Sequence, residues 1–163
     1  NFDNMSVTYA RGEVKNSKLK EVSHEKYKEI NAYLENIERK KEKRLFSPFW
    51  RAAHSVSRDF LMDTVFDDKF VVPCVAGKKL MILSETGEVY PCEILGKSMG
   101  NIKDFDYDMK RLQAHHENQE LVKWIKDSKC KCSFECALAA NVIWSPAAYP
   151  KLIKSAIHNV GKD

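Results

Sequence analysis

The 163-residue sequence lacks the features that mark membrane and secreted proteins. It contains no run of about eighteen apolar residues, the length that a membrane-spanning helix requires, so we expect no membrane partner. Its opening residues, NFDNMSVTYARG, have neither the basic start nor the apolar core of a secretion signal. An initiator methionine is also missing, which is typical of a fragment or a processed piece. We therefore expect a cytoplasmic protein, or part of one.

A strong charge of one sign is absent as well. The net charge is +4, and the segment from Lys15 to Arg44 accounts for all of it, with ten Lys or Arg against six Asp or Glu. Mixed signs in a helical pattern are typical of a solvated helix face. Because the aromatic residues that a single-strand binder interleaves with its basic residues are missing there, we expect no nucleic-acid partner.

The hydrophobic pattern predicts more helix than strand. Helical periodicity predicts helices over 23–44, 48–66, 117–128 and 149–160, and a loop that becomes a helix over 130–143. Alternation predicts a short strand over 5–9 and two strands within 79–92, joined by a turn at 85–87 where Gly87 adopts positive φ. The pattern changes near residue 70, where helical periodicity stops. The fold class expected is α/β, of the α+β kind, with a boundary between residues 69 and 70.

Cysteine is absent from the first 73 residues and then occurs five times within 63, at Cys74, Cys92, Cys130, Cys132 and Cys136. An odd number without a secretion signal favours reduced thiols over a disulfide framework. The predicted hairpin has one cysteine just before its first strand and another, in GEVYPCEILG, just after its second. Since a hairpin brings its two ends together, these two thiols are expected at one edge.

The remaining three cysteines form the group Cys130-x-Cys132-x3-Cys136 on a loop that enters a helix. Cys132 and Cys136 would share a helix face if that helix began early enough. Two pairs of thiols on two elements can enclose a metal centre, either zinc or an iron–sulfur cluster. The spacing forms no tidy zinc ribbon, which favours the cluster, while buried free thiols remain a third interpretation.

The order of these elements resembles a known family. CVAGKKLMILSETGEVYPC, then Gly100-Asn101, then CKCSFEC, is similar to the C-terminal auxiliary-cluster region of radical SAM enzymes, called a SPASM domain, or a twitch domain when it holds one cluster. The segment NMSVTYARGEVKN is similar to a late strand of the radical SAM (β/α) barrel. The resemblance implies the C-terminal part of that barrel over residues 1–69 and a small hairpin-plus-helices cluster domain over residues 70–163.

A two-cluster SPASM domain has more cysteines than this chain, so the resemblance implies one auxiliary [4Fe–4S] cluster held by four of the five thiols. We expect Cys74, Cys92 and Cys136 among them, with Cys132 preferred to Cys130 as the fourth ligand. In the family, such a cluster supports substrate binding or accepts an electron during oxidation or modification of a peptide or a small molecule. A reductase or ferredoxin would then be the electron partner.

The full parent enzyme would also hold S-adenosylmethionine and a second [4Fe–4S] cluster on a Cys-x3-Cys-x2-Cys motif. That motif is absent from this chain, so we do not expect the chain to be active alone. Arg11 would lie on the S-adenosylmethionine or substrate side of the barrel. Trp124 and Trp144 are expected in the core, and the neighbouring His115 and His116 on the surface.

Two other interpretations stay open. The first is a non-catalytic interaction module that holds zinc on four cysteines. The second is a metal-free helical adaptor that binds an acidic partner through the basic helix within 15–44.

Overall fold

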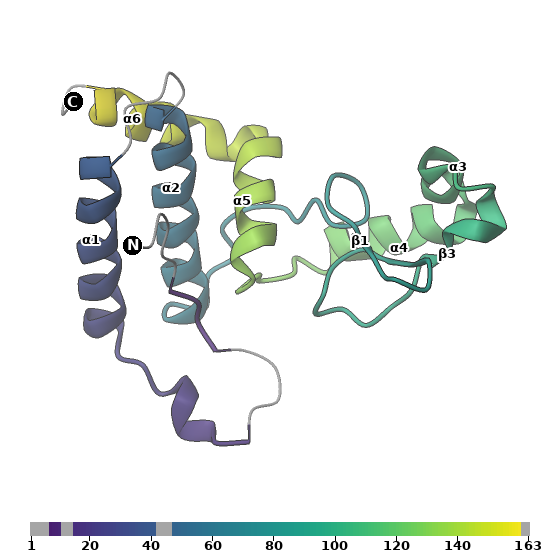
Figure 1. The fold of residues 1–163 in the computed structure, drawn as a ribbon, viewed down its shortest axis with the longest axis horizontal. Helices are drawn as coiled ribbons and strands as arrows, with labels where there is room; N and C mark the ends of the chain where they lie inside the picture. The colour runs from purple at the N-terminus through teal and green to yellow at the C-terminus, as the bar shows by residue number, and fades with distance from the viewer. Residues whose placement is uncertain (1–6, 11–14, 42–46, 161–163) are drawn as a thin grey trace.

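The computed structural model of this chain describes residues 7–10, 15–41 and 47–160. These residues form two parts, which we call the helical part and the arm (Figure 1). The helical part consists of α1 (His24–Lys41), α2 (Ser47–Val65), α5 (Glu135–Trp144) and α6 (Tyr149–Val160), with short 3-10 helices η1 (Ser17–Lys20) and η3 (Pro146–Ala148). The arm projects to one side and contains the sheet and two further helices.

The helical part is organised around α2, which contacts α1, α5 and α6. One face of α2 is almost fully apolar, with Ala52 and Val56 buried, because small and branched side chains at helical spacing form a continuous stripe. Val142 of α5 and Leu152 of α6 pack into the same core. This large core therefore joins helices from the two ends of the described chain, and α5 and α6 return to α2 after the arm has been completed.

The arm is built on a small antiparallel sheet in the order β1 (Ile82–Leu83), β2 (Glu88–Tyr90) and β3 (Gly100–Asn101). In register, Ile82 pairs with Tyr90 and Val89 pairs with Gly100. The 3-10 helix η2 (Ile102–Phe105) follows β3, and α3 (Met109–Ala114) and α4 (His116–Asp127) complete the arm. Its own small core consists of Val89, Met99, Ile102 and Leu112.

Most of the elements expected from the sequence are present. The helices expected over 23–44, 48–66, 117–128, 130–143 and 149–160 correspond to α1, α2, α4, α5 and α6, and the α+β class is confirmed. The hairpin turn is confirmed too, with Gly87 at a φ of 95°. Not expected were α3 and β3, which occupies the Gly100-Asn101 segment.

The segment before α1 differs from the expectation. Residues 7–10 belong to no helix or strand, so the strand expected over 5–9 is wrong for its described residues. Arg11 lies outside the described residues. Among the described helices, none is both long and apolar enough to cross a membrane.

Candidate metal centre

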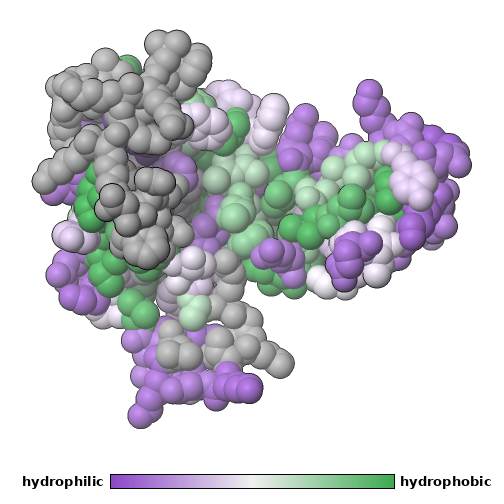
Figure 2. Space-filling view, viewed as in Figure 1, coloured by the Kyte–Doolittle hydropathy of each residue, from purple (hydrophilic) through white to green (hydrophobic). Residues whose placement is uncertain are grey.

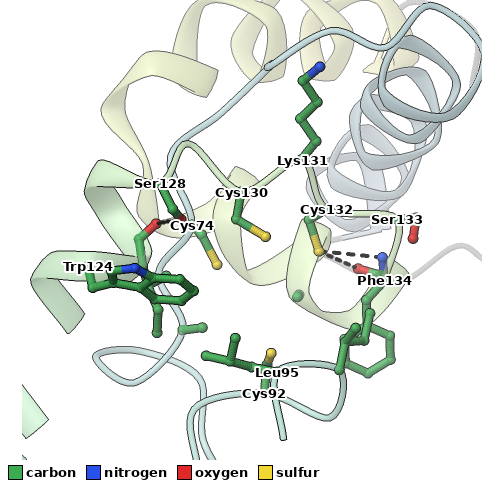
Figure 3. A pocket seen from close by; sticks show the side chains of 14 residues that line it. Cys74, Cys92, Leu95, Trp124, Ser128, Cys130, Lys131, Cys132, Ser133 and Phe134 are labelled. Carbon is green, nitrogen blue, oxygen red and sulfur yellow. Dashed lines mark hydrogen bonds between the residues drawn. The ribbon is translucent and has the colours of Figure 1, made fainter. Parts of the chain in front are cut away.

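A cavity of about 240 Å³ lies where the arm meets the helical part (Figure 3). Its lining comes from the two ends of the β1–β2 hairpin, the end of α4, the loop 128–134 and the first turn of α5. The lining is mostly apolar, with Ala76, Ile125, Phe134 and Ala137 among its residues. The cavity is unusual because several cysteine side chains line it.

Four of the five cysteines line this cavity: Cys74, Cys92, Cys130 and Cys132. Figure 3 shows their sulfur atoms facing a common space from three separate segments of the chain. Cys74 precedes the hairpin and Cys92 follows it, as expected, while the other two come from the loop 128–134. The structure therefore brings together thiols that are up to 58 residues apart in the sequence (132 − 74 = 58).

Local backbone features present each thiol at the cavity. Pro91 is fully buried and, lacking an N–H, directly precedes Cys92 at the end of β2. Beyond Cys74, a tight loop closes when the amides of Lys78 and Lys79 donate to the Val75 carbonyl. After α4, Lys129 adopts a left-handed φ of 48°, which turns the chain away from the helix axis and into the cysteine loop.

Cys136 lies elsewhere. It is exposed and is not part of the cavity lining. The reason is that α5 begins at Glu135, so Cys136 sits in the first turn of the helix while Cys132 lies in the loop before it. The condition under which these two residues would share a helix face is not met. The cavity lining therefore contains Cys130 and not Cys136, while the expectation that Cys136 is a ligand stays a prediction.

The four thiols interact electrostatically in all six pairwise combinations. Burial raises the pKa of Cys132 to about 12, a value that also includes the lowering effect of the Phe134 amide and smaller increases from the other three thiols. Burial also raises the pKa of Cys74 and of Cys130, again with contributions from neighbouring cysteines. Several thiolates cannot accumulate in this cavity without a compensating positive charge, which a metal centre supplies.

Three hydrogen-bond donors lie next to the thiols. The Phe134 amide donates to Cys132 Sγ at 3.4 Å, and the Ala76 amide lies beside Cys74. The third donor is Asn141 on α5, whose side chain is only 1% exposed and whose Oδ1 accepts from the Val75 amide at 2.8 Å. Within the described part of the chain its Nδ2 has no hydrogen-bond partner. An unmet buried donor costs about 1–3 kcal/mol, so its position beside the thiols calls for an explanation.

The mouth of the cavity is apolar and partly open. Ile94 and Trp124, both part of the lining, are 54% and 47% exposed, and Lys97 Nζ lies 4.2 Å from the centre of the Trp124 ring. The expectation that Trp124 and Trp144 belong to the core is wrong, since Trp144 is 53% exposed as well. Figure 2 shows apolar surface running from the helical part onto the arm, with hydrophilic residues covering the tip of the arm.

The donor set was compared with what different metal centres require. Among the described residues, no three His, Cys, Asp or Glu side chains form a group that could hold a metal ion. In a [4Fe–4S] cluster each thiolate binds a separate iron, so the four sulfurs surround a larger body than one ion. Four thiols from three segments surround the cavity of about 240 Å³, although no three ligands among the described residues are close enough for one ion. This arrangement suits a multi-iron cluster better than a single zinc ion.

The other residues singled out from the sequence lie away from the cavity. His115 and His116 have ring centroids 4.7 Å apart in the arm, and neither lines the cavity. Asn141 and Lys97 were not identified from the sequence. Only the position of Asn141 on the buried side of an otherwise apolar helix, at ECALAANVIW, could have drawn attention to it.

Comparison with known proteins finds no family model, no curated protein and no solved structure that matches this chain.

Proposed function

We propose that this chain is the auxiliary-cluster region of a radical SAM enzyme and that it binds one [4Fe–4S] cluster through Cys74, Cys92, Cys130 and Cys132. The observation that carries the proposal is the convergence of these four thiols, from both ends of a hairpin and from one loop, on a single cavity. The order of the cysteine, glycine and asparagine positions along the chain supports the family assignment.

A bound [4Fe–4S] cluster would supply one-electron chemistry at this position. Four protein thiols provide one ligand for each iron, which leaves no iron open to a substrate. This favours electron transfer over direct coordination of a substrate. The partners are then a reductase or ferredoxin and the peptide or small molecule that the parent enzyme oxidises or modifies. Cleavage of S-adenosylmethionine is not assigned to this chain, because the Cys-x3-Cys-x2-Cys motif is absent from its sequence.

The protein's own residues would prepare the cavity for the cluster. The Phe134 amide stabilises negative charge on Cys132 Sγ. The mostly apolar lining would restrict the access of water to the half-buried sulfurs of Cys74, Cys92 and Cys132, while Cys130 is exposed.

The proposal is tested by purifying the chain without oxygen and supplying iron and sulfide. We expect about four iron and four sulfide per chain and a broad absorption near about 400 nm. Cys130→Ser should abolish most of this absorption, whereas Cys136→Ser, a matched control two residues into α5, should retain it. Retention in Cys130→Ser with loss in Cys136→Ser would reverse the ligand assignment.

The two rival interpretations predict different results. A colourless, air-stable protein with one zinc per chain would favour the zinc-binding interaction module and reject the cluster. A protein that binds no metal, and that keeps its folding when Cys92 and Cys132 are both replaced by serine, would favour the metal-free adaptor.

A further inference from the structure

Asn141 connects α5 to the segment that carries Cys74. The residue lies in the middle of α5, 1% exposed, and its Oδ1 accepts from the amide of Val75, the residue that follows Cys74. That contact spans 66 residues of sequence and fixes the orientation of the side-chain amide. Oδ1 is engaged with the backbone, so Nδ2 is the end of the amide that remains to donate.

The hydrogen bond to the Val75 amide places the Asn141 side chain next to the Cys74 segment. Burial raises the pKa of the Cys74 thiol, and the backbone amide of Ala76 and, to a lesser extent, the side chain of Asn141 oppose that rise. Within the described part of the chain, Nδ2 itself has no hydrogen-bond partner. A neutral thiol is a weak acceptor, whereas a thiolate accepts strongly. The amide is therefore placed where a thiolate at Cys74 would satisfy it and a thiol does not.

We propose that Asn141 is a positioning residue of the metal centre, whose Nδ2–H donates to Cys74 Sγ when that sulfur is a metal-bound thiolate. The inference rests on the proposed function and adds to it a specific control of the cluster by α5. Hydrogen bonds to ligand sulfurs withdraw negative charge and stabilise the reduced cluster, so they raise its reduction potential. Asn141 would therefore make the cluster easier to reduce and would hold the Cys74 segment in place.

The test compares two substitutions at this position with one matched control. Asn141→Asp keeps an acceptor for the Val75 amide but removes the donor, and Asn141→Leu removes both. The control is Asn118→Asp. Asn118 is also a buried asparagine, but its side chain donates to the carbonyls of Met99 and Leu112 rather than bonding to the segment next to Cys74. Each protein is loaded with iron and sulfide, and the reduction potential and the Fe–S stretching bands of the Raman spectrum are measured.

We expect both Asn141 variants to have a more negative reduction potential than the wild type. The expected shift is about 59 mV, which for one electron corresponds to a tenfold lower ratio of reduced to oxidised cluster at a fixed potential. Their Fe–S stretching bands should shift, while those of Asn118→Asp should not. Wild-type potential and unshifted bands in both Asn141 variants would overturn the inference and leave the proposed function intact. A wild-type chain that binds no cluster would instead reject the proposed function.

A further measurement does not depend on the variants folding. The wild-type protein is labelled with ¹⁵N-asparagine, loaded, reduced with dithionite and examined by pulsed electron paramagnetic resonance. A ¹⁵N coupling from an asparagine side chain to the cluster supports the donated hydrogen bond. Its absence from a reduced, fully loaded protein overturns the inference.

Discussion

Gly77 holds the Cys74 loop against the rest of the arm, and its replacement by alanine gives the sharpest test of the site's architecture. Gly77 has a φ of 75°, and a Cβ built on it would lie 2.9 Å from Val122 Cγ2 and 3.4 Å from Pro91 Cβ. Left-handed backbone costs an alanine about 1–2 kcal/mol relative to glycine. Overpacking against α4 and Pro91 adds about 1–3 kcal/mol. The expected loss of unfolding free energy in Gly77→Ala is therefore about 2–5 kcal/mol.

Gly96 supplies the matched control. Its φ of 64° is similar, but a Cβ there would meet no atom within 4 Å. Gly96→Ala should therefore lose only the backbone contribution, about 1–2 kcal/mol. Urea unfolding of the metal-free, reduced proteins, followed by circular dichroism, measures both losses. The difference isolates the steric contact, and Gly77→Ala should also bind less iron because the contact displaces the segment next to Cys74. Equal losses, to within about 0.5 kcal/mol, would refute the packing described here.

Two further predictions concern the sheet and the cavity mouth. Hydrogen bonds from Ser98 and Asn101 hold the pKa of Glu88 below its ordinary value. The ionised carboxylate therefore stabilises the fold at pH values above the ordinary pKa of glutamate, and this stabilisation is lost as the pH falls through the lowered pKa. Glu88→Gln should accordingly be less stable than the wild type at pH 7, and the difference between their urea unfolding midpoints should disappear below about pH 4. A difference that does not change with pH would contradict this. Trp124→Ala should speed the loss of cluster absorption in air because it opens the cavity mouth. Trp144 has a similar exposure but is not part of the lining, so Trp144→Ala should not speed that loss. Equal rates of loss in the two variants would show that Trp124 does not shield the centre.

Long amphipathic elements could be predicted from the sequence, and very short ones could not. α6 has strong helical periodicity, and the expected range 149–160 matches its bounds. β3 contains only Gly100 and Asn101, and it forms because β2 offers a free edge, which is a property of the folded arm. α3 has six residues, too few to establish a periodic pattern. Pairing and packing, rather than local preference, determine these two elements.

The sequence predicts that cysteines from the hairpin and from the later loop come together, but not which of the later cysteines line the cavity. Hairpin geometry predicts that Cys74 and Cys92 share an edge, and the structure places both in one cavity. The choice between Cys130 and Cys136 depended on where α5 begins, and a shift of a few residues in that boundary rotates Cys136 away from the cavity. Asn141 could not be assigned, because its partner, the Val75 amide, becomes adjacent only when α5 packs beside the hairpin.

The position of the four thiols between two separate cores has a consequence for assembly. Cys132 packs against the large core, whereas Cys92 follows β2, whose Val89 belongs to the small core. A cofactor bound to both would be an inorganic crosslink between two parts of the chain that are otherwise joined by contacts such as the Asn141–Val75 hydrogen bond. Its insertion would then restrain the angle between the two parts.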